Sequence, residues 1–364
     1  MKSINEENTL ARDHKSASEK SQAWLKENTK RFAFKKLERE VIQTGACVEC
    51  GSCVEGCPVD ALTGERIEGK YVPTLTGKCT ACGICYAMCP RSAILELDTI
   101  GDFISVWKVR SLGNHSRQDG GAVTAILGLM LDNKEIEAAI VVRQKEGTPW
   151  MPVAKRVTSK KEVFEYGGTI YTHAQVVGEL LNGYKDNLSS MAVVGTACNI
   201  EAVNRMQVHP GGLFHVDPKM KVFKISLFCM ESFDYEGLVS FLKKEGIDVS
   251  KVERFAIAKG NFMVTVGGEV KSWPVKDLDS IATSSCAYCN DLTGRTSDIS
   301  CGNIGTDDDW TTVIVRSKRA EGILKDAIKK GVIEAEELDD KSVQAIINSA
   351  RFKMNKRYKL MPAH

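Results

Sequence analysis

Eight cysteines near the start of the chain repeat one spacing pattern, C-x2-C-x2-C-x3-C-P. The first copy consists of Cys47, Cys50, Cys53 and Cys57, and the second copy consists of Cys79, Cys82, Cys85 and Cys89. Three cysteines at this spacing wrap a loop around one face of a [4Fe–4S] cubane, and the fourth ligates the cluster of the other copy. The pattern therefore predicts two crossed clusters, one held by Cys47, Cys50, Cys53 and Cys89 and the other by Cys79, Cys82, Cys85 and Cys57.

A pair of zinc sites is the alternative for this region. Zinc sites favour two C-x2-C pairs separated by a long gap, which fits poorly with two cysteine runs that each end in Cys-Pro. Residues 45–98 instead resemble a small α+β, bacterial-type 2[4Fe–4S] ferredoxin domain. Such a domain transfers electrons, but its motif does not identify their source or destination.

Five more cysteines follow: Cys198, Cys229, Cys286, Cys289 and Cys301. The first two each follow a strand-like run, with a helical stretch between them, as in one βαβ unit. Parallel strands would bring both to the carboxyl edge of a sheet, where α/β proteins bind ligands. With the C-x2-C pair that comes next, four thiols are available for a third [4Fe–4S] cluster. A zinc site and buried structural cysteines stay open on spacing alone, and Cys301, which has no partner, is expected to be structural.

Three glycine-bearing turns could hold a nucleotide cofactor. Residues 118–124 (QDGGAVT) open a predicted helix, and the free N–H groups at a helix start suit a diphosphate, although plain capping is the alternative. Turns at 195–197 and 298–305 are the other two, and none is the G-x-G-x-x-G fingerprint of a Rossmann dinucleotide site. The candidate cofactor contacts are Gln118, Asp119, Gly120, Gly121, Thr124, Thr196, Asn199, Asp298, Ser300, Gly302 and Gly305. No general acid or base is nominated.

The elements that must position these residues change character along the chain. Residues 1–20 are polar and predict a mobile tail, and residues 24–42 predict a helix that packs on a neighbouring domain. After residue 98, strands are predicted at 138–142, 192–194, 222–227 and 313–315, and helices at 122–131, 174–181, 201–208 and 235–244. A hairpin with a Gly267-Gly268 turn is predicted at 262–270, and the last 45 residues are expected to be helical.

This alternation predicts an α/β domain with a mixed, partly parallel sheet. The expected organisation is a polar, partly helical extension at 1–44, the ferredoxin-like domain at 45–98 and the α/β domain at 99–364. The 49 basic and 47 acidic residues nearly balance, so nucleic acid is not the expected partner. The sequence has no signal-peptide core and no apolar run long enough to span a membrane, which predicts a cytoplasmic protein, at most peripheral on a larger complex.

Four further stretches resemble the family of beta subunits of coenzyme F420-reducing hydrogenases and F420-dependent dehydrogenases. They are 117–127 (RQDGGAVTAIL), 195–200 (GTACNI), 228–230 (FCM) and 286–316, which contains C-x2-C-x-D, S-D-I-S and W-x-x-V-I-V-R elements. The resemblance implies an FAD-containing α/β flavoprotein domain with F420 as its substrate. It also implies a [4Fe–4S] cluster beside the flavin, held by Cys198, Cys229, Cys286 and Cys289.

The resemblance further implies a converter between two-electron and one-electron chemistry. F420 exchanges only hydride and clusters exchange single electrons, whereas FAD does both, so FAD belongs between them. Arg117, Arg143 and Arg205 are candidates by position for the carboxylates or phosphate of F420, although solvated charges are the alternative. A redox partner protein or further subunits are expected. Two alternative functions remain open: a ferredoxin-dependent flavin reductase of a different organic substrate, and a non-catalytic electron-transfer subunit.

Overall fold

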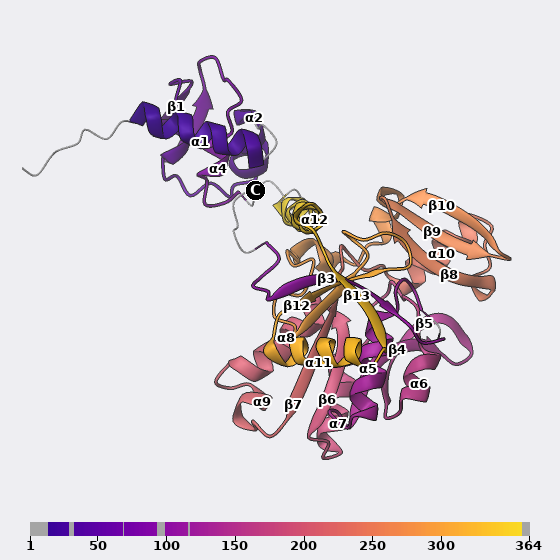
Figure 1. The fold of residues 1–364 in the computed structure, drawn as a ribbon. Helices are drawn as coiled ribbons and strands as arrows, with labels where there is room; N and C mark the ends of the chain where they lie inside the picture. The colour runs from indigo at the N-terminus through magenta and orange to yellow at the C-terminus, as the bar shows by residue number, and fades with distance from the viewer. Residues whose placement is uncertain (1–13, 29–32, 68, 93–98, 116, 359–364) are drawn as a thin grey trace, which may run out of the picture. The chain divides into compact units, whose positions relative to one another are not determined.

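The computed structural model describes residues 14–28, 33–67, 69–92, 99–115 and 117–358. The chain divides into two compact units (Figure 1). The N-terminal unit comprises Met1–Leu97 together with Asn355–His364, and the larger unit comprises Asp98–Met354. Each unit has its own buried apolar core, so each can position its own cysteines.

The N-terminal unit consists of short elements connected by the cysteine loops. Its helices are α1 (His14–Asn28), α2 (Phe34–Leu37), the π-helical turn η1 (Glu38–Ile42), α3 (Ser52–Glu55) and α4 (Ile84–Ala87). Its strands are β1 (Leu62–Ile67) and β2 (Lys70–Leu75), which pair as an antiparallel hairpin. Phe34, Leu37 and Val41 are buried with Cys53 and Cys85, so α2 and η1 close the core around the cysteines.

Two predictions for the start of the chain are wrong. Of the mobile tail predicted at 1–20, residues 1–13 lie outside the described residues, whereas residues 14–20 belong to the helix α1, in which Ala, Glu, Lys and Gln favour helix. The single helix predicted at 24–42 is two helical segments, because α1 ends at Asn28 and α2 begins at Phe34. The second segment packs on the adjacent ferredoxin-like domain, since Phe34, Leu37 and Val41 are buried among the cysteine loops, and this confirms the predicted packing on a neighbouring domain.

An eight-stranded mixed sheet forms the centre of the larger unit, in the order β13-β3-β12-β11-β7-β6-β4-β5. The four strands β11, β7, β6 and β4 are parallel neighbours, and antiparallel strands flank them on both sides. This confirms the predicted mixed, partly parallel sheet. The bounds are β3 (Ser105–Ser111), β4 (Ala138–Lys145), β5 (Thr148–Val157), β6 (Ser190–Thr196), β7 (Lys221–Leu227), β11 (Ile299–Gly302), β12 (Thr311–Val315) and β13 (Ile333–Glu337).

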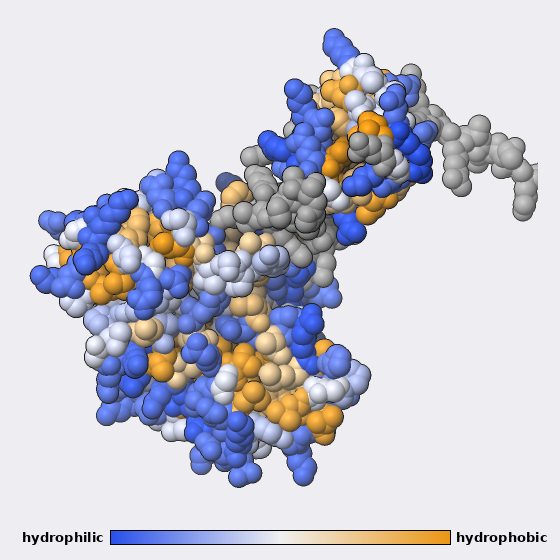
Figure 2. Space-filling view, turned by 180° about the vertical axis from the view of Figure 1, so that it is seen from behind, coloured by the Kyte–Doolittle hydropathy of each residue, from blue (hydrophilic) through white to orange (hydrophobic). Residues whose placement is uncertain are grey.

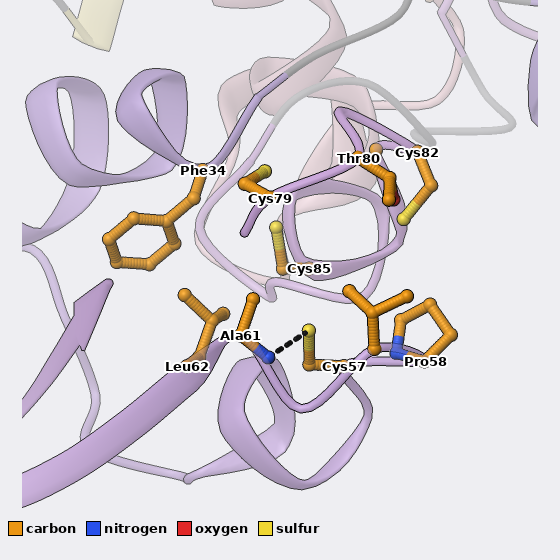
Figure 3. A pocket seen from close by; sticks show the side chains of 11 residues that line it. Phe34, Cys57, Pro58, Ala61, Leu62, Cys79, Thr80, Cys82 and Cys85 are labelled. Carbon is orange, nitrogen blue, oxygen red and sulfur yellow. Dashed lines mark hydrogen bonds between the residues drawn. The ribbon is translucent and has the colours of Figure 1, made fainter. Parts of the chain in front are cut away.

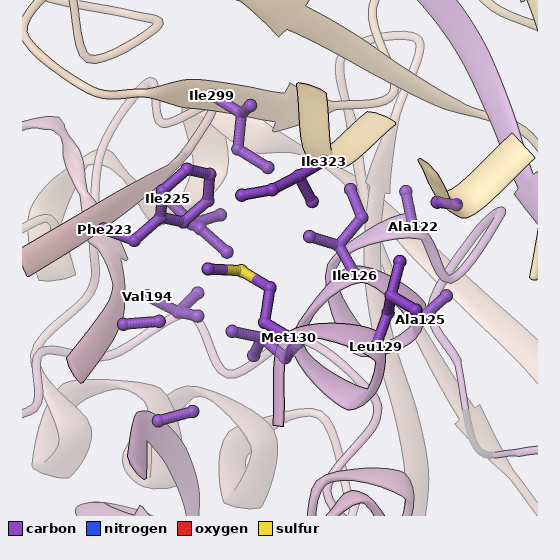
Figure 4. Close-up of a cluster of buried hydrophobic side chains, with 14 of the residues drawn as sticks. Ala122, Ala125, Ile126, Leu129, Met130, Val194, Phe223, Ile225, Ile299 and Ile323 are labelled. Carbon is purple, nitrogen blue, oxygen red and sulfur yellow. The ribbon is translucent and has the colours of Figure 1, made fainter. Parts of the chain in front are cut away.

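Helices cover both faces of this sheet. Alternate side chains of a strand point to opposite faces, and in β6 Val194 joins the core beneath α5 and α11 while Val193 joins the core beneath α7 and α8. Figure 4 shows the first core, in which Met130 of α5 lies among Val194, Phe223 and Ile323. The helices are α5 (Ala122–Asp132), α6 (Lys160–Glu165), α7 (Val176–Lys185), α8 (Ala197–Val208), α9 (Leu213–Val216), α10 (Tyr235–Lys244), α11 (Lys318–Lys329) and α12 (Asp340–Tyr358).

A second, three-stranded antiparallel sheet follows α10, in the order β10-β9-β8. The hairpin predicted at 262–270 is confirmed, and both Gly267 and Gly268 in its turn have positive φ angles. Short 3-10 helices precede and follow this sheet, and the last of them carries Cys286. The bounds are η2 (Val249–Lys251), β8 (Val252–Ala258), β9 (Asn261–Val266), β10 (Glu269–Pro274), η3 (Val275–Ile281) and η4 (Ser284–Tyr288).

The sequence patterns did not predict the hairpin strands β1 and β2 of the N-terminal unit, or β3, β5, β11 and β13 of the larger unit. The last 45 residues were predicted to be helical, but β13 adds a charged edge strand in which Glu334 and Glu336 pair with Arg110 and Lys108 of β3. The predicted turn at 298–305 is wrong over Ile299–Gly302, which is the strand β11. Four residues are too few to show a strand period, and this strand is buried between β7 and β12.

The face shown in Figure 2 is mostly hydrophilic, with apolar residues gathered in patches. Among the described residues, no helix combines the length and apolar character that crossing a membrane would require. Exposed apolar side chains include Val208 at the end of α8 and Val216 at the end of α9.

Candidate functional site

Two cavities in the N-terminal unit sort the eight ferredoxin-like cysteines into two sets of four. One cavity is lined by Cys57, Cys79, Cys82 and Cys85 (Figure 3). The other is lined by Cys47, Cys50, Cys53 and Cys89. Each set takes three cysteines from one copy of the motif and the fourth from the other copy. This is the grouping that the crossed-ligand rule requires.

The two motif loops share one backbone conformation. Glu49 and Ala81 occupy the same place in each copy, and both have φ near +55° (57° and 55°). Gly51 and Gly83 follow two residues later with φ of 75° and 85°. These left-handed residues curl the chain so that the N–H groups of Glu49 and Ala81 donate to the sulfur atoms of Cys47 and Cys79, at 3.4 Å each.

Burial makes the inner thiols unfavourable as isolated anions. Together with the charges of the neighbouring cysteines, it raises the pKa of Cys53 to about 11 and that of Cys85 to about 12. By contrast, hydrogen bonds from Ser52 lower the pKa of the exposed Cys50. Thiolates so close together need positive charge between them, and the iron ions of a cubane would supply it.

The larger unit brings four further cysteines, here called the second cysteine set, to the carboxyl edge of the parallel strands. They are Cys198, Cys229, Cys286 and Cys289. Cys198 lies in the first turn of α8, directly after β6, and Cys229 follows β7. Because β6 and β7 are adjacent and parallel, both residues reach the same edge. Cys286 and Cys289 arrive from η4 and its end, where the N–H of Ser232 donates to the Cys286 sulfur at 3.3 Å.

Electrostatic coupling shows that these four thiols are neighbours. Burial, opposed by the charge of Lys353 and reinforced by Cys286, Cys198 and Cys289, raises the pKa of Cys229 to about 12. Within the described part of the chain, no three His, Cys, Asp or Glu side chains converge on a position for a single metal ion. A cubane places its irons at separate corners and needs thiols that surround it without meeting at one point. Cys301 lies apart, buried in β11 within the core beneath α5.

The turn before α5 has the free donors that a diphosphate needs. The N-cap residue Gly121 has a φ of 74° and, being glycine, offers no side chain to cap the helix. Gly120 has no room for a side chain, since a Cβ there would lie 2.3 Å from the Val109 carbonyl oxygen. Gln118 donates to the Phe255 carbonyl oxygen, and Asp119 pairs with Arg254, so these two side chains hold the turn. Thr124 lies in the first turn of the helix.

The other two predicted turns use their polar groups within the protein. Thr196 donates to the side chain of Asn199 at 2.9 Å as part of a capping box at the start of α8, and it also contacts the Cys198 sulfur. Asp298 accepts from the backbone N–H of Lys224, and the fully buried Ser300 accepts from Arg316 at 2.9 Å.

Two glycines after β11 are required by packing. A Cβ at Gly302 would collide with Phe228, and Gly305, with a φ of 94°, lies against Ile346 of α12. Both contacts fix the segments that carry Cys229 and α12. The structure thus gives these glycines a role near the second cysteine set that does not depend on a flavin.

The three candidate arginines differ in their surroundings. Arg205 is exposed and pairs with Glu201 one helical turn away, at 3.0 Å. Arg117 donates to the Ser111 carbonyl oxygen. Arg143, at the carboxyl end of β4, lies 5.6 Å from the centre of the Tyr166 ring, and its Nε is buried without a hydrogen-bond partner in the described residues. Arg143 therefore keeps a free buried donor for an anion.

Lys353 was missed entirely at the sequence level. It lies on α12 and reaches the second cysteine set, where its Nζ donates to the carbonyl oxygens of Cys229 and Asp291. No local pattern could indicate this, because the contact joins residues 124 and 62 positions apart.

Three protein-family models match the chain in order. A 4Fe-4S dicluster domain matches residues 39–90. The N-terminal part of the coenzyme F420 hydrogenase/dehydrogenase beta subunit matches residues 106–181, and its C-terminal part matches residues 188–341. The first match covers the crossed cysteine sets, and the other two cover the sheet and the second set.

Known proteins resemble the chain over most of its length. It is 31% identical to a subunit of the F420H2 dehydrogenase of Methanosarcina mazei, over 78% of this chain and 82% of that protein. It is 30% identical to the coenzyme F420-dependent sulfite reductase of Methanocaldococcus jannaschii, over 82% of this chain and 49% of that protein.

A solved structure is also similar, namely that of the F420-reducing [NiFe] hydrogenase complex from Methanosarcina barkeri. The TM-score is 0.68 at 27% identity, over 72% of this chain and 92% of the matched chain. The family models, the relatives and the shared fold agree. This chain therefore belongs to the family of coenzyme F420 hydrogenase/dehydrogenase beta subunits and carries a 4Fe-4S dicluster domain before the family domains.

Proposed function

We propose that this chain is an iron–sulfur flavoprotein that transfers hydride between coenzyme F420 and FAD and relays single electrons through [4Fe–4S] clusters. The observation that carries the proposal is the arrangement of its thiols. Two crossed sets of four cysteines lie in the N-terminal unit, and the second cysteine set lies at the carboxyl edge of the parallel strands in the larger unit. A relay from a flavin to a partner protein needs such a series of one-electron carriers.

FAD would bind at the start of α5, where the N–H groups of the first helical turn suit a diphosphate. Gly120 and Gly121 let the turn pack closely against Val109 and His115, which fixes the helix start. When bound, FAD supplies the exchange between two-electron and one-electron chemistry. The chain's own task is to hold the reacting groups in place. The Arg254–Asp119 pair keeps the turn in the conformation that exposes its N–H groups.

Coenzyme F420 carries anionic groups, and Arg143 is the residue we assign to them. Its guanidinium is partly buried, lies over the Tyr166 ring and retains an unpaired Nε. A buried donor without a partner is unfavourable, so an incoming carboxylate or phosphate oxygen would gain a charge-assisted hydrogen bond. Arg143 also donates to the Tyr166 hydroxyl at 3.3 Å, which orients its guanidinium and leaves the Nε for the ligand. Arg205 pairs with Glu201 and Arg117 donates to the Ser111 carbonyl oxygen.

The N-terminal unit would pass electrons to or from a redox partner or another subunit. Two relatives fit this view: one is named as a subunit of F420H2 dehydrogenase, and the matched structure is a hydrogenase complex. The apolar side chains of Val48 and Val59, which are exposed beside the cysteine loops of this unit, offer surface for such a partner.

The test is to purify the chain anaerobically and mix it with reduced F420 while recording the absorbance spectrum. Rapid appearance of oxidised F420, with loss of flavin and cluster absorbance, is the expected result. A bound flavin that stays oxidised would contradict F420 as the substrate and favour another organic substrate. Purification with clusters but without flavin would leave only an electron-transfer subunit.

A further inference from the structure

Lys353 is buried to an extent that lysines seldom reach. Only 4% of it is exposed, although lysine is rarely buried without a charged partner. Its Nζ donates to the carbonyl oxygen of Asp291 at 2.8 Å and to that of Cys229. These two carbonyls belong to the segments that carry the second cysteine set.

No carboxylate neutralises this ammonium among the described residues. The side chain of Asp291 is engaged elsewhere, since it accepts from the N–H groups of Thr293, Gly294 and Arg295 and pairs with the Arg295 guanidinium. The charge of Lys353 instead acts on the thiols. Burial raises the pKa of both Cys229 and Cys286, and Lys353 opposes the shift in each case.

The ammonium is held in place by a packed helix. Ile346 and Ala350, which precede Lys353 on α12, are buried against Leu292 and Ile314. Leu292 in turn accepts from the backbone N–H of Cys229 at 2.9 Å. The lysine, its helix and the cysteine segments are therefore packed together, and the ammonium is held beside the segments that carry the thiols.

We propose that the Lys353 ammonium raises the reduction potential of a [4Fe–4S] cluster held by Cys198, Cys229, Cys286 and Cys289. This inference rests on the proposed function, because it requires that third cluster. A cubane with four thiolates carries two negative charges when oxidised and three when reduced, so it takes up one electron and no bond forms or breaks. A buried cation beside it stabilises the more negative state, and the low local polarity makes this effect large. In the proposed function the electron comes from reduced FAD.

The experiment is a redox titration of the anaerobic full-length protein, with dithionite as reductant and the cluster followed by electron paramagnetic resonance. The signal that disappears in Cys286→Ala identifies the third cluster. Lys353→Met removes the charge and the hydrogen bonds, Lys353→Gln removes the charge but keeps a donor, and Lys353→Arg keeps the charge. Lys341→Met is the matched control, since it removes an exposed lysine from the same helix.

Both neutral variants should shift the equilibrium at least about tenfold toward the oxidised cluster at a fixed potential, which is about 59 mV for one electron. Lys353→Arg and Lys341→Met should leave the potential within a few-fold of the wild type. Loss of the cluster from both neutral variants, with retention in Lys353→Arg, would support the same electrostatic role.

Three results would overturn the inference. They are an unchanged potential in both neutral variants, a shift in Lys353→Met alone, and loss of the cluster from all three Lys353 variants. The second would assign the effect to the hydrogen bonds, and the third to packing. A protein in which Cys286→Ala removes neither iron nor signal would instead contradict the third cluster, and with it that part of the proposed function.

Discussion

Cys301 shows how strongly a residue's environment decides what a cysteine does. It lies in β11, is 2% exposed and packs in the core beneath α5 and α11. Burial alone raises the pKa of its thiol to about 12 from a value of 9.0. The thiol therefore stays protonated at neutral pH and is a poor ligand and a poor nucleophile.

This burial predicts an alkaline effect on stability. Above pH 9 the unfolded chain releases the Cys301 proton while the folded chain keeps it, so unfolding becomes easier by up to about 1.4 kcal/mol per pH unit until about pH 12. Cys301→Ala should be less stable than the wild type at pH 8, and the gap between their melting temperatures should narrow by pH 10.5. Thermal scans at both pH values measure this, and a constant gap would contradict the assignment.

Arg143 gives a second prediction at the residue scale. Arg143→Met should raise the KM for reduced F420 about 10- to 100-fold with little change in kcat, because a hydrogen bond to a charged group contributes about 1.5–3 kcal/mol. Steady-state oxidation of reduced F420 measures it. Arg205→Met, which removes an exposed arginine paired with Glu201, should leave KM within twofold. Equal effects of both variants would argue for a nonspecific loss of positive charge.

At the scale of elements, parallel pairing explains why the second cysteine set, that of the larger unit, can form. Register places Thr196 of β6 opposite Leu227 of β7, so the residues after both strands leave the sheet at one edge. The segment from η4 to Asp291 crosses this edge and brings the remaining pair of thiols. The Asp291 side chain fixes the turn that follows this segment, since it accepts from the backbone N–H groups of residues 293–295.

Because the second cysteine set shares no cysteine with the two sets of the N-terminal unit, removing one of its thiols should release the iron of one cluster only. Cys286→Ala should remove about one third of the bound iron and leave the two clusters of the N-terminal unit intact, since each cluster depends on its own thiolates. Iron analysis together with the cluster absorbance measures the loss. Cys301→Ala is the matched control and should keep all of the iron. Unchanged iron in Cys286→Ala would remove the third cluster from the proposal.

At the scale of the whole molecule, the two units have separate cores and separate cysteine sets. Damage to the clusters of one unit should therefore leave the cofactors of the other in place. With FAD and three clusters, a complete reductive titration should consume about five electrons per chain, two for the flavin and one for each cluster.

This count predicts the outcome of disabling the N-terminal unit. Replacing Cys53 and Cys85 together by alanine should lower the uptake to about three electrons, because each cavity loses one ligand while the larger unit is untouched. The bleaching of flavin by reduced F420 should persist, whereas delivery to a protein acceptor should stop. Anaerobic titration with dithionite gives the count, and loss of the flavin signal in this variant would show that the units depend on each other.

The sequence by itself determined the features that depend on short-range spacing. Cys47 to Cys57 and Cys79 to Cys89 specify crossed sets, because a loop of fixed length can place its thiols in few ways. The runs that became β4, β6 and β7 show apolar patterns long enough to identify strands, and α5 and α10 show helical ones. These strands and helices were enough to predict the mixed sheet and to place Cys198 and Cys229 at one edge of it.

The tertiary structure alone decided the features that depend on packing between distant segments. The charged sequence of β13 predicts a helix, but this segment forms an edge strand whose glutamates pair with Arg110 and Lys108 of β3. The segment β11 is a strand because it pairs with β7 on one side and with β12 on the other. The unpaired Nε of Arg143 and the placement of Lys353 beside the thiols also depend on contacts between segments that are distant in the sequence. Local sequence fixes which conformations a segment favours, but which charges end up buried together depends on how the segments pack.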